Sequence, residues 1–215
     1  MELPTLFGDI DRFGRVTIED NCYSMPSPLD ARRYGTRAGF VRAARARGGG
    51  VGRPIHVFFE RLARIGAGRS AYTTLSLRDQ NELGHCVPLT FRRSSSGTVM
   101  VEVTEIRGAD WPRLSNYYRL DSLLTAVESC VKESNLYRRM VRKSPLRLRV
   151  LPPLRNAWAQ YLVAGDGYNT RWPALYGGRE VNCRVAALSF IWILMREPDT
   201  VRSTAVAELK RLFRG

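Results

Sequence analysis

Residues 70–107 carry the clearest structural signal in the chain, because apolar and polar side chains alternate there over three successive runs. The run 70–78 (SAYTTLSLR) is rich in Thr and Tyr, which are enriched in strands. The runs 87–93 (VPLTFRR) and 98–107 (TVMVEVTEIR) flank the loop SSSG and predict a β-hairpin. In the last run Val99, Val101 and Val103 fall on one side of the strand. Together these runs predict an antiparallel sheet.

Apolar residues spaced three and four apart predict helices on both sides of this sheet in the sequence. Before it, we expect helices at 36–50, capped by Thr36, and at 53–68, with Pro54 in the first turn. After it, we expect helices at 120–143, 183–196 and 200–213. Short strands are predicted at 14–20 and 146–150. The fold class is therefore α+β, with a small antiparallel sheet flanked by helices and a helical C-terminal half.

The length of 215 residues, 44% of them apolar, suits one well-buried core. We expect a single domain over residues 1–215. The alternative is a subdivision near 108–116, which would separate an α/β region (residues 1–107) from a mainly helical region (residues 117–215).

The sequence shows no signal for insertion into a membrane or for export. No run reaches the roughly 18 apolar residues of a membrane-spanning helix. The first residues are acidic and interrupted by Pro and Gly, unlike a signal or transit peptide. We therefore expect an intracellular protein of the cytoplasm or nucleus, or one at the inner face of a virion, neither secreted nor transmembrane.

Cysteines and histidines are few and scattered, and no pair has the spacing of metal ligands. We expect the cysteines to be small core residues, and we expect neither a metal nor a cofactor. The cysteines are Cys22, Cys86, Cys130 and Cys183, and the histidines are His56 and His85.

Charge is the strongest compositional feature, with 34 basic against 20 acidic residues and a net charge of +14. Only three of the basic residues are lysines, so 31 are arginines. Codon bias in a GC-rich genome can explain that ratio, but it does not explain the excess of positive charge. Arginine forms bidentate hydrogen bonds with phosphate and stacks on bases. The excess indicates an anionic partner, or non-specific attraction to polyanions.

Two stretches concentrate this charge without any acidic residue, 136–150 (LYRRMVRKSPLRLRV) and 32–53. Basic residues at a helix C-terminus complement the helix dipole, which accounts for Arg138 to Lys143 but not for Arg147 and Arg149 on a following strand. The alternative for each stretch is a solvated face. The candidate nucleic-acid-binding residues are Arg138, Arg139, Arg142, Lys143, Arg147, Arg149 and Arg155 in the first region, and Arg37, Arg42, Arg45 and Arg47 in the second.

Aromatic residues lie near the first stretch, as platforms for base stacking would. They are Tyr117, Tyr118, Tyr137, Trp158 and Tyr161, and for any single one of them a place in the core is the better interpretation. We therefore expect a non-enzymatic assembly protein that binds an anionic polymer, RNA or a ribonucleoprotein, and that forms homo-oligomers.

An anionic membrane surface is the alternative partner, because arginine-rich surfaces bind membranes as well as RNA. The amphipathic segment 53–68 would then present Phe58, Phe59 and Leu62 as the membrane or partner face. The other use of this stripe is packing in the core.

Catalytic patterns are weak, and we assign no catalytic residue. His85 and Cys86 are neighbours in a strand and point apart. The order of an arginine (Arg61 or Arg69), YTTLS (72–76) and VEVTE (101–105) loosely resembles ADP-ribosyltransferases, and it leaves an enzyme of that kind as a further alternative.

The order of elements over residues 14–107 resembles rhabdovirus-type matrix proteins: a strand, a helix, a basic glycine-containing connection, an amphipathic helix and an antiparallel sheet. The stretch GGVGRPIHVFFERLARIGAG carries most of the likeness. The resemblance implies a non-enzymatic protein that bridges a nucleocapsid and an anionic membrane face.

Overall fold

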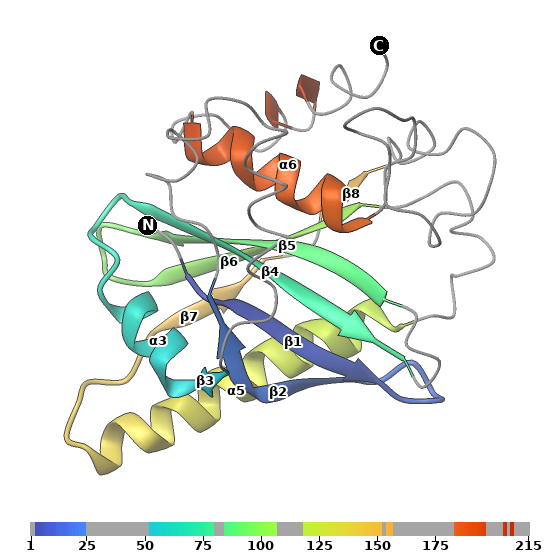
Figure 1. Cartoon of the computed structure of the whole chain (residues 1–215). Coiled ribbons are helices and arrows are strands. Elements are labelled where there is room, and N and C mark those ends of the chain that lie inside the picture. The colour runs from blue at the N-terminus through green and yellow to red at the C-terminus, as the bar shows by residue number, and fades with distance from the viewer. Residues whose placement is uncertain are drawn as a thin grey trace, which may run out of the picture.

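A computed structural model of the chain describes residues 3–24, 52–79, 84–106, 118–151, 154–156 and 183–196, together with 204, 205, 207 and 208. These residues form one sheet with helices on both of its faces (Figure 1). The strands are β1 (Thr5–Ile10), β2 (Val16–Tyr23), β3 (Arg53–Pro54), β4 (Ser70–Arg78), β5 (Gly84–Arg93), β6 (Val99–Ile106), β7 (Leu148–Val150) and β8 (Leu154–Asn156). The longer helices are α3 (His56–Ala63), α5 (Leu120–Met140) and α6 (Cys183–Arg196).

The α+β class is confirmed, but the sheet is neither small nor purely antiparallel. It has eight strands in the order β3-β2-β1-β4-β5-β6-β7, and β8 also pairs with β6. The pairs β1–β4, β6–β7 and β6–β8 are parallel. The segments after α5 thus add parallel strands beside the predicted hairpin.

Strand β1 was not predicted, because its glycine and the preceding proline indicate a break. Leu6 and Ile10 are buried on one side of the strand, in the alternation typical of a sheet. Gly8 lies where the register with β2 shifts, and a Cβ atom there would come within 2.6 Å of the Thr17 carbonyl oxygen. The glycine therefore permits a close approach of two strands.

The two sides of the sheet are covered by different helices, α3 and α5 on one and α6 on the other (Figure 1). Val99, Val101 and Val103 are buried on the side of α3 and α5, as their alternation predicts. Phe58 of α3 packs edge to face against Phe91 of β5, with ring centroids 5.5 Å apart. The main core therefore lies between the sheet and these two helices.

Most elements inside the described ranges agree with the sequence. Strand β4 has the predicted bounds, the hairpin β5–β6 is confirmed, and α6 spans 183–196 as expected. Helix α3 begins later than predicted, because Arg53 and Pro54 pair with β2 and the Ile55 amide donates to the Asp20 carbonyl at 2.7 Å. The predicted helix 36–50 and most of 200–213 lie outside the described residues. No described helix is long and apolar enough to cross a membrane.

Candidate anion-binding site

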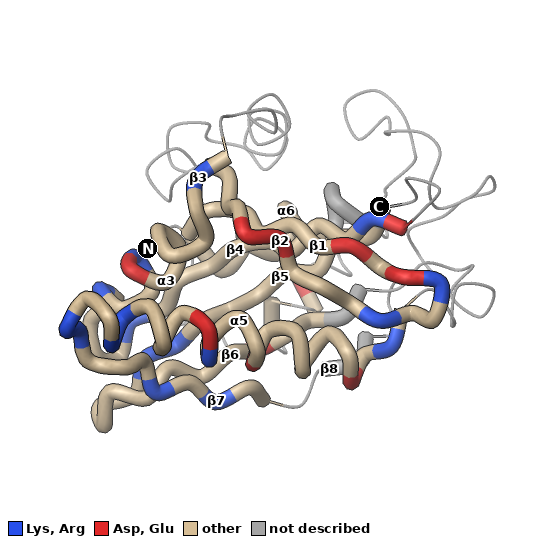
Figure 2. The backbone as a smooth tube through the Cα atoms, turned by 90° about the horizontal axis from the view of Figure 1, so that it is seen from below, with Lys and Arg blue, Asp and Glu red and all other residues tan. Residues whose placement is uncertain are grey.

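Three segments that are distant in sequence meet at one end of the molecule: residues 60–69, 92–99 and 138–149. The Arg69 carbonyl accepts from the Arg93 amide at 3.1 Å, and the Arg147 carbonyl accepts from the Val99 amide at 2.8 Å. Together the segments carry eleven basic residues and one acidic residue, Glu60. We call these three segments the basic end. Figure 2 shows basic residues crowded at this end and acidic residues along β1 and β2.

Most of these cations are available to a partner. Eight of them are exposed and Arg61 is half-buried. The nine are Arg61, Arg64, Arg69, Arg92, Arg139, Arg142, Lys143, Arg147 and Arg149. Five of them were predicted as binding residues, and four come from segments that the sequence does not connect to the first stretch.

Arg138 has a structural role in this end, because it is 8% exposed and hydrogen-bonded to two other segments. Its guanidinium donates to a Glu60 carboxylate oxygen at 2.6 Å and to the Ser144 carbonyl at 2.8 Å. Lys143 donates to the other Glu60 oxygen at 2.8 Å. The hydrogen bond from Lys143, followed by the charge of Arg138, holds the pKa of Glu60 below its ordinary value. Glu60 therefore clamps the end of α5 to α3.

The end of α5 is a Schellman motif in which an arginine stands where glycine is usual. The Lys143 amide donates to the Arg138 carbonyl at 2.7 Å, and the Arg142 amide donates to the Arg139 carbonyl at 3.0 Å. Arg142 has φ 56°, a left-handed conformation that costs free energy for any residue with a Cβ atom. The chain thus keeps a cation at a position that glycine would occupy with less strain.

The strand after this turn spreads the charge across the sheet. Arg149 pairs with Met100, and Met100 pairs with Arg92 on its other side. The two exposed arginines therefore flank Met100 on one face of the sheet. This agrees with the predicted outward orientation of Arg149.

The remaining predicted binding residues do not belong to the described part of the basic end. Arg155 lies in β8, opposite Glu105 of β6. Arg37, Arg42, Arg45 and Arg47 lie outside the described residues.

The predicted membrane face of the segment 53–68 is in the core. Phe58, Phe59 and Leu62 are exposed by 1%, 4% and 0%, so they pack under the sheet rather than face a partner. Core packing was the other use that the sequence left open for this stripe.

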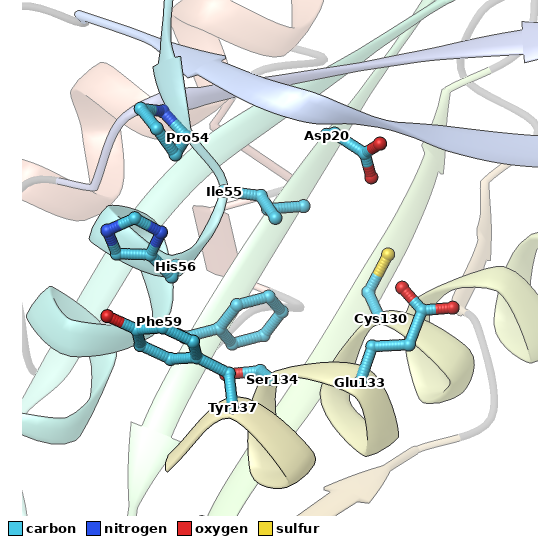
Figure 3. Close-up of a pocket in the computed structure, with 9 residues that line it drawn as sticks. All are labelled: Asp20, Pro54, Ile55, His56, Phe59, Cys130, Glu133, Ser134 and Tyr137. Carbon is cyan, nitrogen blue, oxygen red and sulfur yellow. The ribbon is translucent and has the colours of Figure 1, made fainter. Parts of the chain in front are cut away.

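A cavity of about 270 Å³ lies beside the last turns of α5, between α3 and β2 (Figure 3). The rings of His56 and Tyr137 stack on one side of it, with centroids 4.9 Å apart. Burial, together with the charges of Glu133 and Asp20, raises the pKa of Cys130 in its wall to about 12. Such a thiol stays protonated at neutral pH, so it is a poor nucleophile.

Several described members of the other catalytic patterns make contacts within the sheet. His85 packs its ring near Tyr118, with centroids 5.6 Å apart, whereas the Cys86 thiol accepts from the Ser76 hydroxyl at 3.9 Å. Thr73 of the YTTLS run is buried, and its hydroxyl donates to the Pro4 carbonyl at 2.6 Å. These groups hold the sheet together.

Comparison with known proteins adds little. No protein-family model matches the chain, and no curated protein matches it. A crystal structure of the Legionella pneumophila effector protein RavZ (F222) is similar over 76% of this chain and 46% of that one, with 14% sequence identity and a TM-score of 0.33. The chain thus spans less than half of that structure, and a likeness at this score carries no argument about function.

Proposed function

We propose that this protein is a non-enzymatic binding protein whose basic end docks on a phosphate-bearing, polyanionic partner. One observation carries the proposal: eleven basic residues against one acidic residue, gathered from three distant segments at one end of the fold. RNA or a ribonucleoprotein is the partner favoured by the sequence, and an anionic membrane is the alternative. Both present rows of phosphates, which arginine binds through bidentate hydrogen bonds.

Helix-dipole compensation does not account for this arrangement. The dipole acts within the last turn of a helix, where Arg138, Arg139 and the following residues lie. Arg69 and Arg92 lie at the ends of β4 and β5 rather than in that helix, and backbone hydrogen bonds join their segments to the same end of the sheet. Mutual repulsion among these charges costs free energy in the absence of a counter-charge, which an anionic partner would supply.

The test is charge reversal at the basic end, with Arg142, Arg147 and Arg149 all replaced by Glu. A single-stranded RNA oligonucleotide serves as the polyanion, titrated at several salt concentrations. If four to six arginines engage phosphates, log K should fall with log salt with a slope of roughly −3 to −4. The triple variant should bind far more weakly and with a shallower slope.

The matched control is Arg12, Arg15 and Arg119, all replaced by Glu. These residues make the same charge change near the start of α5, where the Arg119 amide donates to the Gly14 carbonyl at 2.8 Å. The control should keep most of the affinity, and both variants should melt close to the wild-type temperature. Equal loss of affinity in the two variants would show that net charge, rather than the basic end, governs binding.

A further inference from the structure

The large exposed aliphatic side chains of the described structure gather at the C-terminal end of α5, in and next to the basic end. Five large apolar residues of the described ranges are exposed, and four of them lie within residues 136–141. Met140 is 83% exposed and Leu136 is 59% exposed, one turn apart on α5, and Val141 follows them. Isolated exposed apolar residues are ordinary, but a cluster of them marks a contact surface.

This cluster sits at a projecting tip. Helix α5 runs past the edge of the sheet, and its C-terminal turn extends from the body (Figure 1). The clamp on Glu60 and the left-handed Arg142 fix this turn in place. Because this tip is rigid, its apolar side chains point outward and do not fold back onto the protein.

The apolar cluster is limited to the last turn of the helix. The positions that continue the face of Leu136 and Met140 toward the N-terminus are Ser129, Lys132 and Glu133, which are all exposed and polar. A helix that lies flat on a membrane carries a long apolar face instead. The short apolar cluster therefore suits insertion of the end of α5 into a membrane, rather than a helix lying flat on it.

The surroundings of the tip are complementary to anionic headgroups. Arg139 precedes Met140, and Arg142 and Lys143 follow Val141, all of them exposed. Basic residues close to a bilayer attract its anionic lipids, while apolar residues between them reach the acyl boundary.

RNA explains the same tip less well, because sequence-tolerant RNA binding uses aromatic rings as stacking platforms. Among the aromatic residues expected for that role, Tyr118 is buried, and Tyr137, which is 38% exposed, stacks on His56. Tyr117, Trp158 and Tyr161 lie outside the described residues. The most exposed apolar side chains at the tip are aliphatic.

We propose that the partner of the basic end is an anionic phospholipid membrane surface, into which Leu136, Met140 and Val141 insert while the surrounding arginines bind headgroup phosphates. This inference rests on the proposed function, because it names the partner of the same site.

The experiment compares flotation with vesicles of phosphatidylcholine alone and of phosphatidylcholine mixed with phosphatidylserine, at low and high salt. The neutral double variant Leu136→Ser, Met140→Ser keeps every charge and should lose about tenfold or more in partitioning to the mixed vesicles. Its affinity for single-stranded RNA should stay at the wild-type value. The control Phe13→Ser removes a large apolar side chain outside the tip, which is 56% exposed, and should float as the wild type does.

A gain of binding provides a second readout that does not depend on damage to the protein. Met140→Trp places an interface-preferring ring at the tip, so partitioning to the mixed vesicles should increase. Its fluorescence should shift to the blue when those vesicles are added.

The outcomes separate the two proposals. Unchanged flotation of the double serine variant would overturn insertion of the apolar side chains. RNA binding with no flotation of the wild type would overturn the membrane as the partner and leave the basic end as an RNA site. A concentration-dependent dimer that the double serine variant abolishes, with no flotation, would assign the tip to a second copy of the chain. If charge reversal at Arg142, Arg147 and Arg149 changes neither RNA binding nor flotation, the proposed function fails as well.

Discussion

The two ends of α5 are built in opposite ways. At its N-terminal end the helix is joined to the start of β2, where the Val16 amide donates to the Ser122 hydroxyl at 2.8 Å. Opposite charges are paired there, since Arg119 lies 2.7 Å from Asp121. At its C-terminal end the helix is joined to α3 by the carboxylate of Glu60, and the exposed charges around that carboxylate are positive.

This difference assigns two roles to α5: its N-terminal end attaches the helix to the sheet, and its C-terminal end exposes side chains to a partner. The N-terminal end contributes a neutral, hydrogen-bonded attachment to the sheet. The C-terminal end combines a backbone strained at Arg142 with like charges, which both lower stability, and with aliphatic residues that gain no burial. Features that cost stability and are retained together are typical of binding sites.

The largest expected effect is the loss of the clamp. Glu60→Gln removes the counter-charge of a buried arginine, and it should destabilise the fold by about 2 kcal/mol. For a chain of this length that lowers the melting temperature by about 4–8 °C. Thermal unfolding followed by circular dichroism measures it. The matched variant at the other end, Asp121→Asn, disrupts a solvent-exposed pair and should leave the melting temperature almost unchanged.

The clamp should also make stability depend on pH. The folded-state pKa of Glu60 is lowered from an ordinary value of 4.5, so its contribution is present above that value and fades as the pH falls through the folded pKa. The stability gap between wild type and Glu60→Gln should therefore be full at neutral pH and shrink below about pH 4.5. Urea midpoints of both proteins across this range measure the gap. A stability difference that stays constant down to acid pH would show that Glu60→Gln does not act through loss of the ion pair.

A smaller effect of opposite sign is expected at Arg142. Arg142→Gly relieves the left-handed conformation and should stabilise the fold by about 1 kcal/mol. It should also weaken binding to anionic vesicles several-fold, because a cation at the tip is lost. Arg142→Ala is the control, since it removes the charge but keeps the Cβ atom and so should not raise stability. If Arg142→Gly bound as tightly as wild type, the strain would have no connection to binding.

The sequence predicts the local elements of this fold better than it predicts their pairing. Alternation identifies β4, β5 and β6 because each strand faces apolar neighbours in regular order. Strand β1 is missed because Gly8 is needed for the close approach of the Thr17 carbonyl. That contact arises from the pairing of β1 with β2, which the local sequence does not show. The parallel pairing of β1 with β4 joins residues about seventy positions apart, which no local pattern encodes.

The candidate site shows the same division. The run of basic residues at 138–149 is visible in the sequence, and most of its members are exposed, as a run of like charges predicts. The burial of Arg138 is not visible, because it depends on a carboxylate 78 residues away. Neither is the membership of Arg69 and Arg92, which reach the site through the hydrogen bonding of β5 with the segment before β4. The sequence predicts the membrane or partner face at Phe58, Phe59 and Leu62, which are buried, because periodicity alone cannot distinguish a stripe that packs inward from one that faces a partner.

The smallest expected effect tests whether the two ends of α5 act independently. A helix of 21 residues is about 30 Å long, and the Debye length is about 10 Å at 0.1 M salt, so a charge at one end is screened from a partner at the other. Arg119→Glu should therefore leave vesicle binding within about twofold of wild type. The same charge change at the tip, Arg142→Glu, changes the net charge by two units. Each unit is worth about 1 kcal/mol near an anionic surface, which predicts a loss of about thirtyfold in binding.

Arg119→Glu should change the stability of the fold little. A glutamate at the N-cap position of α5 interacts favourably with the helix dipole, and the ion pair with Asp121 that is lost is exposed to solvent. Flotation of both variants in parallel gives the ratio directly. Equal losses would show that binding follows the total charge of the protein and that the tip of α5 makes no special contribution to it.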